Sequence, residues 1–211
     1  MKTLGFAAGA ALFACNLVGF SQSEVPCGQA LNAALRPGAI LTIDSRSAGI
    51  EIVGIDQEAI HVSCKADDMD SASHIRLRFS GTSTRARLTI KGAYIKHGNL
   101  QIRIEVPRKT NLGVQMPAGE VKVNEIMGDK NIDLHAGNIT ISSVREWEYR
   151  NIDASVDIGQ VNAQAYGEDK GGFFRVFRKE NAEGEYRLHA HVITGQIDLL
   201  GKNARAGADS Q

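Results

Sequence analysis

The sequence lacks several features that mark particular classes of protein. It has no excess of either charge, because 24 Lys and Arg residues are matched by 24 Asp and Glu residues. Proteins dedicated to nucleic acid need a basic excess to contact phosphates, so we expect no nucleic-acid partner. Heptads are absent, and no stretch of ten or more residues carries a clear helical period, which excludes a coiled coil. Disorder is excluded as well, since apolar residues reach 43%.

The first 23 residues have the organisation of a secretory signal peptide. A single basic residue, Lys2, precedes an apolar run over residues 4–20, and Ser21 and Ser23 then place small side chains where a signal peptidase cleaves. The apolar run is slightly shorter than the ~20 residues that a membrane span needs. We therefore predict cleavage after Ser23, export to the periplasm or the cell surface, and no transmembrane span in the mature chain.

The rest of the 211 residues fits one domain over residues 24–203 and a flexible tail over residues 204–211. Only three cysteines are present, and Cys15 lies within the signal. Its surroundings loosely resemble a lipoprotein acylation site, but Phe13 is bulky and the apolar run continues past the cysteine, so lipid anchoring is not expected. Cys27 and Cys64 form an even pair in an oxidising compartment, which favours a disulfide. Spacing alone leaves two free thiols as the alternative.

Short segments with apolar residues at every second position fill the chain from residue 40 onward, as in residues 41–43, 50–52, 60–62 and 75–79. A period of two with Ile and Val is typical of half-buried strands. The second half repeats one motif of glycine, polar, apolar, polar, apolar, and a shorter version begins at Gly49. The four full copies begin at Gly119, Gly137, Gly159 and Gly195.

These glycines are spaced by 18, 22 and 36 residues, and the last spacing is twice the first. A unit of this length cannot bury its apolar side chains alone, whereas parallel copies stacked on one another can. Glycine suits a sharp corner where the chain needs a positive φ or a close approach. We predict an all-β fold, a single-stranded parallel β-helix (β-solenoid) of about 18–22 residues per coil in which each coil stacks on the one before. A β-sandwich is the alternative.

Two parts of the sequence resemble a known family. Residues 35–43 and 48–54 resemble the opening of the bacterial envelope proteins named "putative adhesins", and residues 102–107 and 112–114, followed by the Gly119 motif, resemble the centre of the same family. The resemblance covers residues 35–201. It implies an exported periplasmic or surface protein with a β-solenoid fold, and it implies no catalytic residues.

Nine basic residues and one acidic residue lie between residues 74 and 109. Arg76 and Arg78 share one side of a predicted strand, and with Arg85 and Arg87 they form a candidate face for an anionic ligand. The alternative is a solvated face that prevents edge pairing. Phe173, Phe174 and Arg175 are a second candidate, a loop that docks a partner, because Phe and Arg are enriched at interfaces. The alternative there is a strand that shelters the last coil.

No catalytic group is evident. Asp133, Asp153, Asp157 and Asp198 are scattered over outward positions, although Asp133 and Asp153 could stack. We therefore predict a non-enzymatic, adhesin-like protein without a cofactor or metal, which binds an acidic envelope glycan or another envelope protein. The alternatives are a polysaccharide-acting β-helix enzyme and a periplasmic structural or stress accessory protein that binds other proteins.

Overall fold

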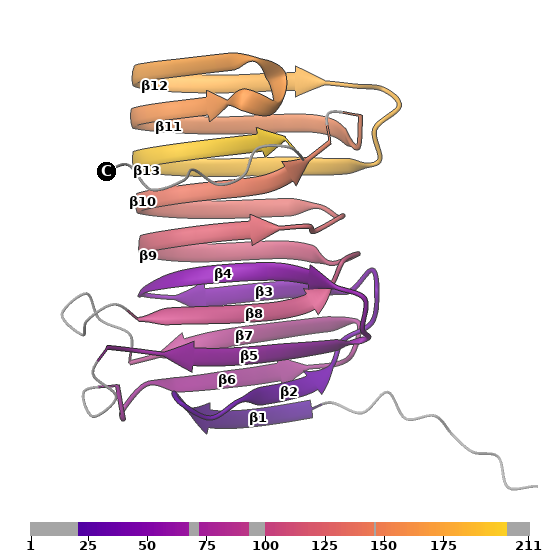
Figure 1. Ribbon diagram of the computed structural model, residues 1–211, viewed down its shortest axis with the longest axis vertical. Coiled ribbons are helices and arrows are strands. Elements are labelled where there is room, and N and C mark those ends of the chain that lie inside the picture. The colour runs from indigo at the N-terminus through magenta and orange to yellow at the C-terminus, as the bar shows by residue number, and fades with distance from the viewer. Residues whose placement is uncertain (1–20, 68–71, 93–99, 146, 202–211) are drawn as a thin grey trace, which may run out of the picture.

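A computed structural model describes residues 21–67, 72–92, 100–145 and 147–201. Residues 1–20 of the predicted signal, with Cys15, and the predicted tail over residues 204–211 lie outside the described residues. The described part is all-β, with one large mixed sheet of thirteen strands (Figure 1). The strands are β1 (Ser21–Pro26), β2 (Leu31–Ala34), β3 (Ile40–Ser45), β4 (Ser47–Ile55), β5 (Ala59–Lys65), β6 (Arg76–Gly81), β7 (Arg85–Lys91), β8 (Gln101–Pro107), β9 (Asn111–Asn124), β10 (Lys130–Val144), β11 (Tyr149–Ala163), β12 (Glu168–Glu180) and β13 (Tyr186–Gly201).

Pairing is parallel in the middle of the sheet and antiparallel at its two ends. One series of parallel neighbours is β7, β3, β9, β10, β13 and β11, in that order. A second parallel series is β8, β4 and β9. At one end β6 and β1 are antiparallel, as are β5 and β2; at the other end β12 is antiparallel to β11. Figure 1 shows these strands lying across the long axis of the molecule and stacked along it.

Each long strand belongs to two layers. The first half of β9 pairs with β3 and the second half with β4, because the strand bends between them. Strands β10, β13 and β11 repeat this bend in register, so Gly119, Gly137, Gly195 and Gly159 form one column. The column requires glycine: Gly137 has φ +130°, and a Cβ there would lie 1.8 Å from the Gly119 carbonyl oxygen.

The core lies between the layers and consists of aliphatic side chains stacked strand on strand. Alternation turns every second residue inward. Thus one inward row of the second layer is entirely aliphatic and at most 2% exposed in each member. It runs through Ile50, Val121, Ile139, Ile197 and Val161.

The stacking order differs from the expected one, in which each unit follows the unit before it. β13 lies between β10 and β11, β3 lies between β7 and β9, and β4 lies between β8 and β9. The physical reason is that β12 returns antiparallel to β11, so the chain re-enters the stack beside β10. All units present nearly the same apolar rows, so the repeat itself does not determine their order.

A disulfide joins Cys27, directly after β1, to Cys64 in β5, with the two Cα atoms 5.1 Å apart. It links the two layers at the end of the sheet formed by β1 and β2. β1 begins at Ser21 and pairs with β6 from that residue. Within the described residues, no helix has the length and apolar character needed to cross a membrane.

Candidate functional site

The four predicted arginines lie on one outward surface of the first layer. Arg76 and Arg78 come from β6, whereas Arg85 and Arg87 come from the neighbouring β7, and each alternates with buried apolar residues. Antiparallel pairing sets Arg76 opposite Lys91 and Arg78 opposite Thr89. The outward cations of β6 and β7, called the basic face below, are Arg76, Arg78, Arg85, Arg87 and Lys91.

The residues of the basic face differ in the hydrogen bonds and ion pairs that they make within the chain. Arg87 donates to the Asp44 carboxylate at 3.0 Å, and Arg76 donates to the carbonyl oxygens of Ser73 and Ile75. Lys91 Nζ lies 3.9 Å from a Glu24 carboxylate oxygen. Arg78 and Arg85 make no ion pair within the described part of the chain. The face therefore keeps positive charge available for a ligand.

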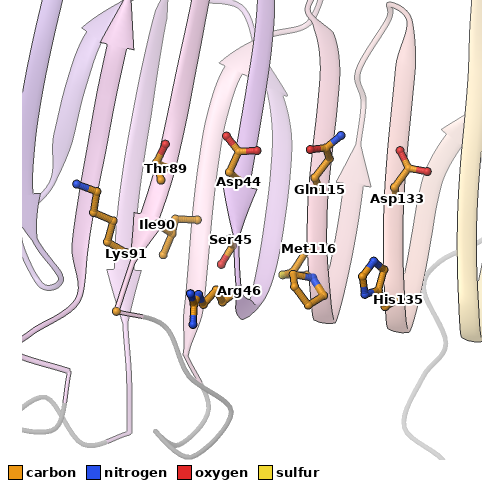
Figure 2. Close-up of a pocket in the computed structure, with 12 residues that line it drawn as sticks. Asp44, Ser45, Arg46, Thr89, Ile90, Lys91, Gln115, Met116, Asp133 and His135 are labelled. Atoms are coloured by element: carbon orange, nitrogen blue, oxygen red, sulfur yellow. The ribbon is translucent and has the colours of Figure 1, made fainter.

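An open groove of about 750 Å³ lies beside the basic face, where the first layer reaches the corner (Figure 2). Two outward rows cross it. Thr89, Asp44, Gln115 and Asp133 form the first row, because the registers set them side by side on β7, β3, β9 and β10. The second row is nearer the corner and includes two cations. It contains Lys91, Arg46, Pro117 and His135.

Both carboxylates of the first row already have a partner farther from the corner. Asp44 pairs with Arg87, and the Asp133 carboxylate lies 3.6 Å from the His189 ring. The Arg87 guanidinium offsets the charge of Asp44, and Arg46 and Lys91 place two cations nearer the corner. Adjacent strands lie about 4.8 Å apart, so each row offers regularly spaced polar groups.

Ser45 marks the buried part of the groove. It is only 7% exposed, and its hydroxyl oxygen is buried without a hydrogen-bond partner among the described residues. A buried hydroxyl without a partner costs about 1–3 kcal/mol. Ser45 alternates with the outward Asp44, so its hydroxyl faces the interior and not the open groove. The buried side chains of Ile90 and Met116 provide an apolar floor beneath it.

Phe173, Phe174 and Arg175 lie in a strand, not in a loop. They belong to β12, which pairs antiparallel with β11 and sets Gly172 opposite Gly159. Phe173 and Phe174 are 68% and 78% exposed. This strand covers the end of the stack.

Among the predicted glycine corners, Gly49 does not join the column. Ala48 lies opposite Gly119, whereas Gly49 lies opposite Glu120. Likewise Asp133 and Asp153 do not stack, because β13 lies between their strands and sets His191 beside Asp133 and His189 beside Asp153. The structure also finds no group of three metal-ligating side chains within the described residues.

A buried lysine was not anticipated. Lys130 is 2% exposed, and its ammonium group donates to the carbonyl oxygens of Ile126 and Gly128 and to the Tyr149 hydroxyl. Burial lowers the pKa of Lys130 to about 7 and raises the pKa of Tyr149. Alternation was the available signal, since it places Lys130 on the same side as Ile132 and Leu134. Arg46 and Ser45 gave no such signal, because their neighbours in the groove are remote in sequence.

Comparison with known proteins finds one solved structure with a similar fold. No family model matches the chain, and no curated protein matches it. A crystal structure described as a "putative cell adhesion protein", from Clostridium sporogenes ATCC 15579, is similar with a TM-score of 0.52 and 11% sequence identity. The match covers 82% of this chain and 99% of that one. At this identity the likeness concerns the fold alone.

Proposed function

We propose that the protein is an exported, non-enzymatic β-solenoid that binds acidic glycans of the cell envelope through its outward polar surface, as an adhesin does. The observation that carries the proposal is the clustering of cations from neighbouring strands beside an open groove. The solenoid is supported by the parallel register and by the glycine column that β9, β10, β13 and β11 share. Export is supported by the signal-like start and by the disulfide.

The ligand class follows from the groups at the groove. Guanidinium and ammonium groups pair well with carboxylates, and Arg46 and Lys91 lie on the corner side of the groove. Sugar hydroxyls both donate and accept hydrogen bonds, which suits the row of Thr89, Gln115 and the two carboxylates. Each contact is weak, so a repeating polymer that occupies several positions gains affinity through multivalency.

Isothermal titration calorimetry with polygalacturonate, a polyuronate, tests the proposal, with dextran as the neutral polymer. We expect polygalacturonate to bind, binding to weaken as salt rises, and dextran to give no heat. Arg78→Ala combined with Lys91→Ala removes two cations and should lower the affinity roughly tenfold or more. Lys65→Ala combined with Lys122→Ala is the matched control, because it removes two exposed lysines from the other layer and should change affinity by less than about twofold.

Two outcomes overturn the proposal. The first is the absence of polygalacturonate binding, or an equal loss in the control variant. The second is the release of new reducing ends from the polymer, which would make the protein a polysaccharide-acting enzyme.

A further inference from the structure

The end of the sheet formed by β12 is open. β12 pairs with β11 on one side, and within the described residues no strand pairs with its other side. Figure 1 shows β12 at one extreme of the stack, with β1 and β2 at the other. The strand is thirteen residues long and bends at Gly172 and Phe174, which have φ of +119° and +51°; on either side of the bend its backbone donors and acceptors can pair with another strand.

Exposed apolar side chains gather at this same end. Seven large apolar side chains are exposed in the described residues, and five of them lie on β12, β11 or β13, the last three strands at this end of the stack. Those five are Ile158, Phe173, Phe174, Val176 and Ile193. Phe173 lies directly opposite Ile158 in the β11–β12 register. Apolar surface that clusters at one edge is typical of an interface.

The charges of β12 favour a second β12 as the occupant. The strand begins with Glu168 and Asp169, and Arg178 and Lys179 lie near its other end, before Glu180. In an antiparallel pair of two copies centred between Phe173 and Phe174, Glu168 of one copy lies opposite Lys179 of the other. Asp169 then lies opposite Arg178. A parallel pair would place like charges together, so the edge is self-complementary in the antiparallel sense alone.

Arg178 and Asp169 keep capacity for a second contact beyond those they make within the chain. Arg178 donates through Nε to Asp153 at 3.3 Å, which leaves its other guanidinium donors available. Asp169 accepts from Gln160 at 2.7 Å and keeps a second carboxylate oxygen. The opposite end of the sheet is a poor competitor, because β1 and β2 are only six and four residues long and β1 ends at a proline.

We propose that two copies of the chain form a dimer through antiparallel pairing of their β12 edges, so that one continuous sheet runs through both. The pairing is two-fold symmetric and therefore closed, with a dimer as its end point. It turns the strand that caps the stack into an interface. This inference is independent of glycan binding.

Sedimentation velocity of the purified protein without ligand, over about 1 to 100 μM, tests the dimer. We expect a concentration-dependent dimer. Arg178→Glu combined with Lys179→Glu makes both ends of β12 acidic, and Glu168→Lys combined with Asp169→Lys makes both ends basic. Each variant alone should dimerise roughly tenfold more weakly or not at all. An equimolar mixture of the two should restore a dimer, which also rules out misfolding as the cause of the loss.

The matched control is Lys65→Glu combined with Lys122→Glu, which reverses two charges on β5 and β9, away from the β12 edge, and should leave the dimer unchanged. A monomer across the whole range would overturn the proposal. So would a dimer that both β12 variants retain, a mixture that stays monomeric, or oligomers that grow beyond two copies.

Discussion

The two halves of the sheet build the same two layers in different ways. Residues 21–107 contribute eight separate strands of four to nine residues. One disulfide links the segment after β1 to β5. Residues 111–201 contribute five strands of 13 to 16 residues that pass from one layer to the other by bending. Bending without interruption requires glycine at the corner, whereas the corner between β3 and β4 carries Ser45 and Arg46.

The corners therefore differ in whether they have room for side chains. Where glycines stack, the backbones approach so closely that no side chain fits. Where the column ends at Ala48, side chains can occupy the corner, and the groove extends from there along the first layer to β9 and β10. We therefore expect stability in the C-terminal half to depend on the glycine column and stability in the N-terminal half to depend on covalent and side-chain links.

Loss of the disulfide should have the largest effect. Cys27 and Cys64 enclose 37 residues, and on the chain-entropy model their bond stabilises the fold by about 4 kcal/mol. Cys27→Ser combined with Cys64→Ser should lower the free energy of unfolding by about that amount in urea denaturation. Hydrogen exchange should quicken first in β2 and β5. Equal loss of protection in β10 and β13 would show that the halves do not differ as described.

A Cβ at the glycine corner should have the next largest effect. Gly137→Ala places a methyl group against the Gly119 carbonyl at a positive φ, and we expect a loss of about 3 kcal/mol from strain and overpacking. Gly113→Ala in β9 is the control, because the added Cβ has room: the nearest atom, Thr42 Oγ1, lies 3.9 Å away. Urea midpoints measure both. If the two variants were equally stable, the column would not be what holds this half.

Particular residues show how far the sequence predicts this molecule. Alternation identifies the strands, because inward positions such as Ile139 and Ile197 must be apolar. The repeat predicts the corner at Gly119, Gly137, Gly159 and Gly195, since positive φ and close approach leave a local signature. The order of the strands has no such signature: β11 and β13 offer almost interchangeable apolar rows. The antiparallel return of β12 covers one side of β11 and so leaves β13 the place between β10 and β11.

The candidate site was predictable only where its residues are close in sequence. Arg76, Arg78, Arg85 and Arg87 are local to two adjacent strands, so alternation alone places them on one surface. The groove joins Arg46, Lys91 and His135, which lie on strands far apart in the sequence. Their approach depends on the register of β7, β3, β9 and β10, which no single segment encodes.

Lys130 provides a test of the C-terminal half through pH. The unfolded chain holds this proton to about pH 10, whereas burial lowers the pKa in the folded protein to about 7. Between these values the unfolded state binds more protons, so Lys130 makes stability rise with pH, by at most about 1.4 kcal/mol per pH unit. Below pH 7 both states are protonated and the burial cost is undiminished.

Lys130→Met should remove this rise. Urea denaturation at intervals between about pH 7 and 9.5 measures it, a range that stays below the ionisation of tyrosine in the unfolded chain. Lys122→Met on the outward surface is the control and should retain the slope. An unchanged slope in Lys130→Met would mean that Lys130 keeps an ordinary pKa in the folded protein.

The smallest effect is expected from a cross-strand ion pair of the N-terminal half. Arg103 on β8 donates to Glu51 on β4 at 2.6 Å and to Glu105 at 3.0 Å, and these two carboxylates raise its pKa. The side chain is 46% exposed, so solvent screens the attraction. Arg103→Gln should lower the free energy of unfolding by about 0.5 kcal/mol at low salt, and by less as salt rises. Urea denaturation at two salt concentrations measures the difference. A loss that matched that of the disulfide, or one that salt did not reduce, would mean that side-chain pairs rather than the covalent link hold this half together.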